Sequence, residues 1–130
     1  MKIIHVIPHT HWDREWFFTS SRAQVYLLKD LKDIITNLET NLGFNCFILD
    51  GQASLIADYL KWRPQDFDRV KKLVQEKKLV IGPWYTQTDQ YLPSGESIIR
   101  NLLYGMQISN NLGGYMNVGY VPDSFGQESS

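Results

Sequence analysis

Four short apolar runs separated by helical patterns constrain the fold of this chain more than any other feature of its sequence. The runs span residues 3–7, 44–49, 79–82 and 117–121. Each has the length of a strand, and the first is rich in β-branched residues, which is typical of a strand buried on both faces of a sheet. Strands that alternate with helices favour a parallel sheet with right-handed crossovers. We therefore predict an α/β fold, either an open doubly wound sheet or part of a barrel.

Between these runs, apolar residues recur at three- and four-residue spacing, as in amphipathic helices. The patterns predict helices from Ser21 to Leu42, over residues 55–60, from near Asp66, and from the N-cap Ser94 to Gly113-Gly114. Ser21-Arg22-Ala23-Gln24 has the form of a capping box, and Gly43 is placed to close the first helix. The sequence has no repeats and no linker, so we expect residues 1–130 to form one domain.

The composition and net charge of the chain argue against nucleic acid and membranes as partners. The chain has 130 residues, of which 43% are hydrophobic and 21% charged, which is ordinary for a globular domain. Its net charge of -1 predicts no binding to nucleic acid or to an anionic membrane, and its apolar runs are too short to span a bilayer. The single cysteine, Cys46, lies in an apolar run, and no signal peptide pattern fits, so we expect a reducing, cytoplasmic location.

Polar side chains follow each of the four runs. The clusters are His9 to Trp16, Asp50 to Gln52, Trp84 to Gln90, and Asp123. In parallel α/β sheets the ligand binds beyond the carboxyl ends of the strands, and these ends meet at one edge. We therefore expect the four clusters to contribute to one site.

The first cluster has the chemistry of a metal site. His11 and Asp13 are separated by one residue, so in an extended segment both side chains project to the same side and can reach one ion. An imidazole with a carboxylate suits zinc or another divalent cation, and a catalytic site needs about three protein ligands. Asp123, just past a predicted strand, is the best-placed third ligand. In the competing interpretation His9 is an ordinary loop histidine and Asp13 caps the next helix.

Residues 83–93 are suited to a sugar ligand. Aromatic rings alternate there with amide and carboxylate groups, and such rings stack on sugars while the polar groups bind their hydroxyls. We expect Trp84 to lie in the site and leave Tyr85 undecided. Asp89 is a candidate substrate contact, although an aspartate in a polar loop more often forms a turn. Asp50 is as well explained by capping or a local hydrogen bond as by a substrate contact.

Several motifs resemble family 38 of the glycoside hydrolases, the retaining α-mannosidases. His11-Trp12-Asp13-Arg14-Glu15-Trp16 is similar to the H-x-D-x-x-W opening of that family, and Val121-Pro122-Asp123-Ser124-Phe125-Gly126 resembles its nucleophile segment. Gly82-Pro83-Trp84-Tyr85 is similar to its G-x-W loop, and Leu49-Asp50-Gly51-Gln52 resembles the bacterial branch. Each motif is short, but together they match in order along nearly the whole chain.

The resemblance implies the N-terminal part of a larger, (β/α)-barrel-like catalytic domain of a metal-dependent exo-α-mannosidase. His11, Asp13 and Asp123 would hold Zn²⁺ or another divalent cation, together with a histidine from later in the family's chain. Asp123 would also be the catalytic nucleophile, and Trp16 would flank the metal-bound sugar. Trp84 and Asp89 would contact the substrate, a mannose-containing oligosaccharide or mannoside.

The resemblance also implies that the 130 residues alone are inactive. In that family the acid/base aspartate lies well beyond the nucleophile in the sequence, so it is not expected among these 130 residues. In addition, no helix pattern follows residues 117–121, so the fourth predicted strand has no helix to cover it. The sequence leaves open whether the full-length protein forms a homo-oligomer.

Two other functions fit parts of the sequence. His9-Thr10-His11 resembles the H-x-H of amidohydrolase-type barrels, in which both histidines bind a metal that activates water. In that case His9 would be essential for metal binding and Asp13 would matter less. The other alternative is a metal- or sugar-binding module without catalytic activity.

Overall fold

The computed structural model describes residues 2–127, and within this range the fold combines four α-helices with a small parallel sheet. Along the chain, the elements are α1 (Ser20–Thr40), β1 (Phe47–Ile48), α2 (Ser54–Trp62), the 3₁₀-helix η1 (Pro64–Asp66), α3 (Phe67–Gln75), β2 (Leu79–Val80) and α4 (Gly95–Asn111). None of the described helices is both long and apolar enough to cross a membrane.

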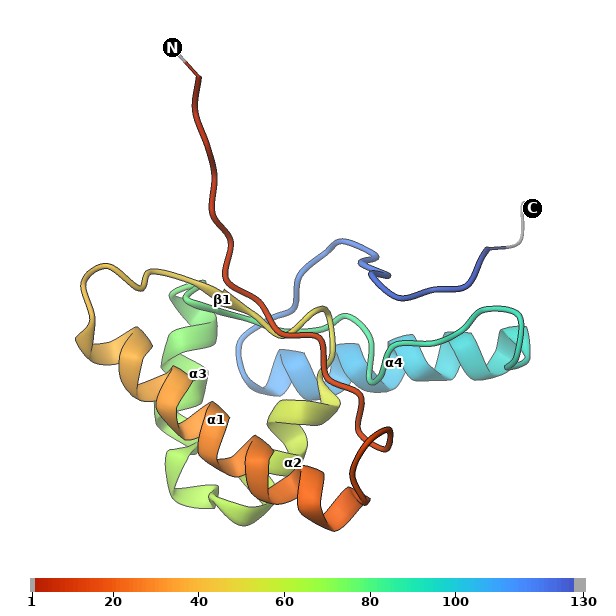
Figure 1. The fold of residues 1–130 in the computed structure, drawn as a ribbon, viewed down its shortest axis with the longest axis horizontal. Coiled ribbons are helices and arrows are strands. Elements are labelled where there is room, and N and C mark those ends of the chain that lie inside the picture. Colours follow the sequence, from red (N-terminus) through yellow and green to blue (C-terminus); the bar gives the residue numbers. More distant parts are fainter. Residues whose placement is uncertain (1, 128–130) are drawn as a thin grey trace.

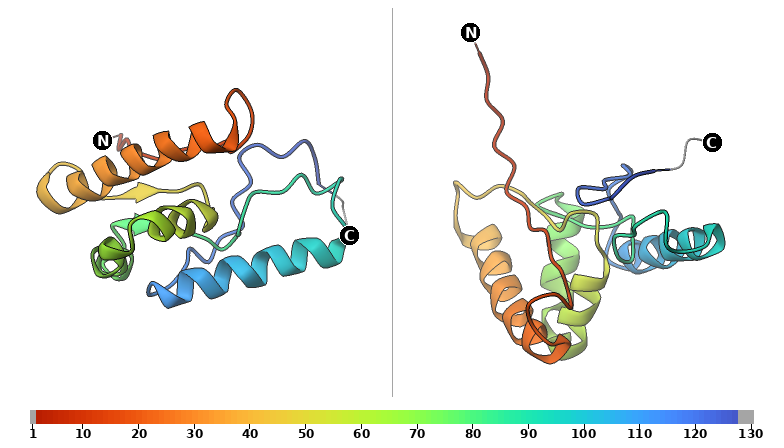
Figure 2. Two further views of the ribbon diagram at one scale, coloured as in Figure 1. Left: turned by 90° about the horizontal axis from the view of Figure 1, so that it is seen from below. Right: turned by 45° about the vertical axis from the view of Figure 1, so that its right-hand side comes forward.

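The two strands confirm the predicted parallel pairing. Phe47 is paired with Leu79, and Ile48 is paired with Val80. Figure 1 shows α1, α2 and α3 on one side of the strands, whereas the N-terminal and C-terminal segments lie on the other side. Figure 2 shows the same helices from below, with β1 between α1 and the α2–α3 pair. The α/β class is therefore confirmed, whereas closure into a barrel stays a prediction because only two strands are paired among the described residues.

The first predicted strand is wrong in its position. Residues 3–7 form no strand in the part of the chain that the structure describes, and Ile4 and Val6 are each 86% exposed. Pairing with β1 occurs a few residues later. The N–H of Ile48 donates to the carbonyl of Pro8, and the N–H of Thr10 donates to the carbonyl of Ile48, both at 3.1 Å. An apolar run shows that a segment can be buried in a sheet, but a partner strand decides where the ladder begins.

The fourth predicted strand is also wrong. Residues 117–121 have no strand pairing among the described residues, although the N–H of Met116 donates to the carbonyl of Ile81 at 2.9 Å. The chain therefore runs beside the end of β2 without forming a ladder. A strand exists only where both partners align, and local sequence cannot encode that alignment.

The hydrophobic core lies between α1, α2, α3 and the strands. The residues of α1 that are buried follow the predicted helical spacing, and they are Ala23, Leu27, Leu31, Ile35 and Leu38. All of these except Ala23 belong to one cluster with Ile56 and Tyr59 of α2 and Val70 and Leu73 of α3. The burial of this stripe was predictable from the sequence, because apolar residues at three- and four-residue spacing lie on one face of an α-helix.

Helix ends agree with the sequence less well. Ser94 is the N-cap of α4, and its Oγ accepts from the N–H of Ser97 at 3.3 Å, as predicted. The capping box predicted at residues 21–24 is wrong, because the N-cap of α1 is Thr19. Gly43 does not close α1, since the helix ends at Thr40 and is followed by the C-cap Asn41. The Oδ1 atom of Asn41 accepts from the N–H of Gly43 at 3.0 Å, so a side chain makes the turn instead of a left-handed glycine.

Candidate metal centre

The three side chains predicted to bind a metal, His11, Asp13 and Asp123, come together at one edge of the sheet. The Nε2 atom of His11 lies 3.3 Å from Oδ1 of Asp13 and 3.3 Å from Oδ2 of Asp123. One potential ligand atom from each residue lies within 4.8 Å of those from the other two. All three side chains are partly exposed, so the group is open to solvent and to a substrate.

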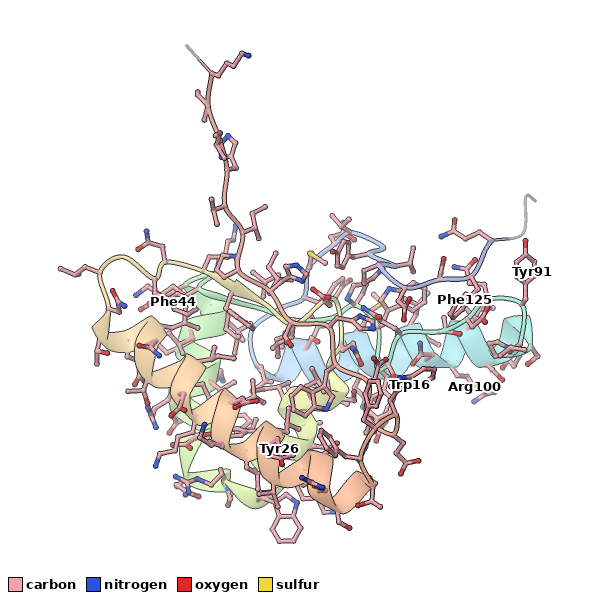
Figure 3. All side chains as sticks on the ribbon, in the orientation of Figure 1. Trp16, Tyr26, Phe44, Tyr91, Arg100 and Phe125 are labelled. Carbon is pink, nitrogen blue, oxygen red and sulfur yellow. The ribbon has the colours of Figure 1, made fainter. Side chains whose placement is uncertain are left out.

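Two hydrogen bonds from the loop after β2 position the segment that carries Asp123. The indole Nε1–H of Trp84 donates to the carbonyl of Tyr120 at 3.1 Å, and the hydroxyl of Tyr91 donates to the carbonyl of Gln127 at 2.9 Å. In Figure 3, Tyr91 and Phe125 lie at the same end of the molecule, on the side of the N-terminal part of α4. The segment is therefore fixed on both sides of Asp123.

A polar cleft of about 180 Å³ opens in front of the three side chains. Besides His11, Asp13 and Asp123, its walls include Gln52, Thr86, Gln87, Thr88 and Asp89. These amides, hydroxyls and carboxylates can both donate to and accept from the hydroxyls of a sugar. The expected meeting of the four polar clusters at one edge is therefore found, although each contributes only some of its residues.

Asp89 forms the turn that was considered for it. Its carbonyl accepts from the N–H of Leu92 at 3.1 Å, and its Oδ1 atom lies 3.4 Å from the N–H of Tyr91. The residue also lines the cleft. A substrate contact by Asp89 stays a prediction.

The two tryptophans predicted to contact substrate have different environments. Trp84 is 5% exposed, lies outside the described lining of the cleft, and supports the Asp123 segment through its indole N–H. Trp16 is 73% exposed and lines a neighbouring hollow of about 370 Å³ that also touches His11 and Asp13. Figure 3 shows Trp16 beside the loop that leads into α1. In this structure Trp84 is thus a supporting core residue, and Trp16 remains the better candidate for contact with a ring.

Asp50 does not cap the following helix, and it is not among the residues that line the cleft. The N-cap of α2 is Ala53, and the carboxylate of Asp50 is fully buried, where it lies 2.8 Å from Nδ1 of His9. His9 therefore faces Asp50, and it lies outside the His11 group in the described part of the chain. This arrangement gives no support to the amidohydrolase alternative, which requires His9 as a ligand.

Sequence reasoning did not single out Gln52 and Gln87 as site residues. The amide of Gln87 donates to the carbonyl of Asp50 at 2.7 Å, so this side chain ties the loop after β2 to the end of β1. Gln52 pairs with Trp84 in an isolated parallel bridge that extends the sheet. The signal was present in the sequence, because both residues belong to polar clusters that follow strands.

Known proteins resemble this chain over nearly its whole length. Residues 1–130 match the model of the N-terminal domain of glycosyl hydrolases family 38. The chain is 40% identical over 126 residues to the putative mannosylglycerate hydrolase of Halalkalibacterium halodurans, covering 96% of this chain and 14% of that protein. It is 22% identical over 129 residues to the α-mannosidase of Saccharomyces cerevisiae, covering 97% of this chain and 12% of that protein.

A solved structure gives the same result. The crystal structure of an α-mannosidase from Enterococcus faecalis has a TM-score of 0.88 and 40% identity to this chain, and covers 92% of this chain and 13% of that one. The chain therefore belongs to glycosyl hydrolase family 38. It spans about one seventh of the length of the bacterial relative that it matches.

Proposed function

We propose that this chain forms the N-terminal part of the catalytic site of a retaining, metal-dependent exo-α-mannosidase. The observation that supports the proposal most directly is the convergence of His11, Asp13 and Asp123 at a polar cleft, in a member of family 38. The substrate would be a mannose-containing oligosaccharide or mannoside, in keeping with the names of the relatives. A cytoplasmic location is part of the same proposal and rests on the sequence alone.

The donor set of this group fits a divalent cation. One imidazole nitrogen and two carboxylate oxygens are ligands that zinc commonly takes, and a catalytic zinc has about three protein ligands. When bound, Zn²⁺ or another divalent cation would supply Lewis-acid chemistry that orients sugar hydroxyls. His11 and Asp13 would be the N-terminal ligands and Asp123 the third.

Asp123 would act as the nucleophile. A retaining glycosidase needs one carboxylate that attacks the anomeric carbon and a second carboxyl group, about 5 Å away, that protonates the leaving oxygen. The Asp123 carboxylate is suitable for attack because it is 57% exposed and lines the cleft. We assign the proton-donor role to no residue of this chain.

The neighbouring polar groups would position the sugar. Gln52 and Gln87 offer amide donors and acceptors at the cleft wall, and Asp89 offers a carboxylate. The exposed ring of Trp16 would stack against the C–H face of the sugar. Binding and orientation are therefore the contributions we propose for these side chains.

Metal binding and product stereochemistry test the proposal. Replacing His11 with Ala should weaken Zn²⁺ binding by more than the roughly 10–100-fold that loss of a supporting residue costs, because a ligand is removed. His9→Ala is the matched control and should retain most of the binding, whereas loss of binding in this variant would favour the amidohydrolase alternative.

For the active protein, ¹H NMR should show the α-anomer of mannose as the first product. Initial release of the β-anomer would contradict a retaining mechanism, and mannose binding without turnover would indicate a non-catalytic module.

A further inference from the structure

A fully buried carboxylate lies behind the imidazole of His11. We propose that Asp50 is a positioning residue, which holds His11 with its Nδ1 proton toward the end of β1 and its Nε2 lone pair toward Asp13 and Asp123. This inference rests on the proposed metal site and extends it by one residue. Asp50 would not touch the substrate, because its side chain has no exposed surface.

The geometry around Asp50 is asymmetric. Its Oδ1 atom lies 2.8 Å from Nδ1 of His9, whereas its buried Oδ2 atom has no hydrogen-bond partner among the described residues. That Oδ2 atom lies 3.9 Å from Nδ1 of His11. The other ring nitrogen of His11, Nε2, faces the carboxylates of Asp13 and Asp123. The imidazole therefore has the buried carboxylate on its Nδ1 side and the proposed metal ligands on its Nε2 side.

The backbone holds the Asp50 carboxylate in this place. Asp50 has a φ of 43° and Gly51 a φ of 74°, so two successive left-handed residues turn the chain at the end of β1. Aspartate tolerates this conformation better than most residues other than glycine, and such outliers concentrate at functional sites. The carbonyl of Asp50 also accepts from Nε2 of Gln87 at 2.7 Å. The position of the side chain is thus set by the turn and by the loop after β2.

The chemistry of imidazole gives this position a consequence. A neutral histidine carries its proton on one ring nitrogen, and only the other nitrogen can bind a metal. A buried carboxylate oxygen without a partner is unfavourable, so it favours the tautomer of His11 that points an N–H toward it. The separation of 3.9 Å is longer than a hydrogen bond, and a ring movement of about 1 Å would close it. Metal-binding histidines commonly donate their second N–H to a carboxylate in this manner.

The alternative is that Asp50 serves only to anchor His9. Asp50→Asn separates the two roles, because it keeps the size of the side chain and removes its charge. We expect this variant to bind Zn²⁺ about 10–100-fold more weakly in a competition assay with a chelating dye. The visible d–d absorption of the Co²⁺-substituted protein should also change, since the orientation of a ligand changes. A purely structural residue would alter stability without altering that spectrum.

Asp66→Asn is the matched control. Asp66 is also a buried aspartate, but it lies in the turn between α2 and α3, at the end of α2 that is remote from β1 (Figure 1). Its replacement should leave Zn²⁺ affinity and the Co²⁺ spectrum unchanged. If Asp50→Asn binds both ions like the wild type, the role of Asp50 is wrong while the metal site stands. If the wild type binds neither ion, the metal site is wrong and the role of Asp50 falls with it.

A measurement on the wild type covers the case in which Asp50→Asn does not fold. The chain has three histidines, so ¹⁵N labelling of histidine with two-bond ¹H–¹⁵N correlation can report the tautomer of each ring in the Zn²⁺-bound protein. We expect His11 to bind Zn²⁺ through Nε2 and to carry its proton on Nδ1. A proton on Nε2 of His11, with Nδ1 bound to Zn²⁺, would overturn the inference.

Discussion

Asp66 shows at the residue scale how a buried charge is stabilised in this domain. It accepts from the hydroxyl of Tyr59 at 2.6 Å and from Nη1 of Arg69 at 2.7 Å. Burial raises the pKa of Asp66, but these hydrogen bonds and the positive charge of Arg69 outweigh it, so the pKa is lowered overall. Hydrogen bonds from the same guanidinium, chiefly, lower the pKa of Glu39. Burial and the hydrogen bond to Asp66 raise the pKa of Tyr59 to about 12.

These shifts predict a loss of stability in acid. Because the carboxyl groups of Asp66 and Glu39 have lower pKa values in the folded state than in the unfolded state, they stabilise the fold above their unfolded values, roughly pH 4. That contribution is lost as the pH falls through their folded pKa values. We expect the free energy of unfolding, measured in urea, to fall as the pH is lowered below about 5. In the Asp66→Asn variant this free energy should depend less strongly on pH.

Asp33→Asn is the control for the acid prediction. Asp33 is exposed and lies 3.9 Å from Lys29, and such surface pairs contribute little to stability. This variant should keep the pH dependence of the wild type. An equal pH dependence of Asp66→Asn and the wild type would contradict the role assigned to the network.

At the scale of elements, α4 positions the loop that lines the cleft. The N–H of Tyr85 donates to the carbonyl of Asn101 at 3.1 Å, and the side chain of Asn101 bonds the N–H and the carbonyl of Thr86 at 3.0 and 2.6 Å. Gly105 of α4 packs against the same loop. A Cβ atom at Gly105 would overlap the carbonyl oxygen of Pro83 and the backbone nitrogen of Tyr85. The absence of a side chain at this point lets the helix approach the loop closely.

Gly105→Ala should therefore destabilise the protein. An alanine raises intrinsic helix propensity by up to about 1 kcal/mol, but overlap with backbone atoms that cannot rotate away costs about 1–3 kcal/mol. We expect a net decrease in the free energy of unfolding and weaker ligand binding, because Thr86 and Gln87 would be displaced from the cleft. Urea unfolding and binding of a mannoside would measure the two effects.

Gly95→Ala provides a matched control in the same helix. A Cβ atom at Gly95 would meet no atom within 4 Å in the described residues. This change should be neutral or slightly stabilising. Equal effects of the two alanines would mean that helix propensity decides the outcome and that the close approach at Gly105 does not matter.

At the scale of the whole molecule, we predict that the 130 residues alone do not turn over a mannoside. Retention requires a second carboxyl group as proton donor, and that role is assigned to none of the residues that line the cleft. An assay with an aryl α-mannoside should show no turnover by the 130-residue chain. The full-length Enterococcus faecalis α-mannosidase serves as the positive control, and comparable turnover by this chain would contradict the assignment of its site residues.

The apolar stripe of α1, the N-cap Ser94 and the ligand candidates His11, Asp13 and Asp123 were readable from the sequence. Helical spacing and capping depend on residues only a few positions apart, and the extended parity of His11 and Asp13 is equally local. Asp123 was joined to these two by its place just past a predicted strand, and the motif resemblance implied the same ligand.

Tertiary structure alone decided where the sheet pairs and which polar groups face each other. It moved pairing of the first segment from residues 3–7 to Pro8 and Thr10, and it buried Trp84 beneath the segment of Asp123. It also directed the carboxylate of Asp50 toward two histidines about forty positions away. These outcomes depend on partners distant in sequence, and a local pattern records the tendency of a residue to be buried but not the neighbour against which it is buried.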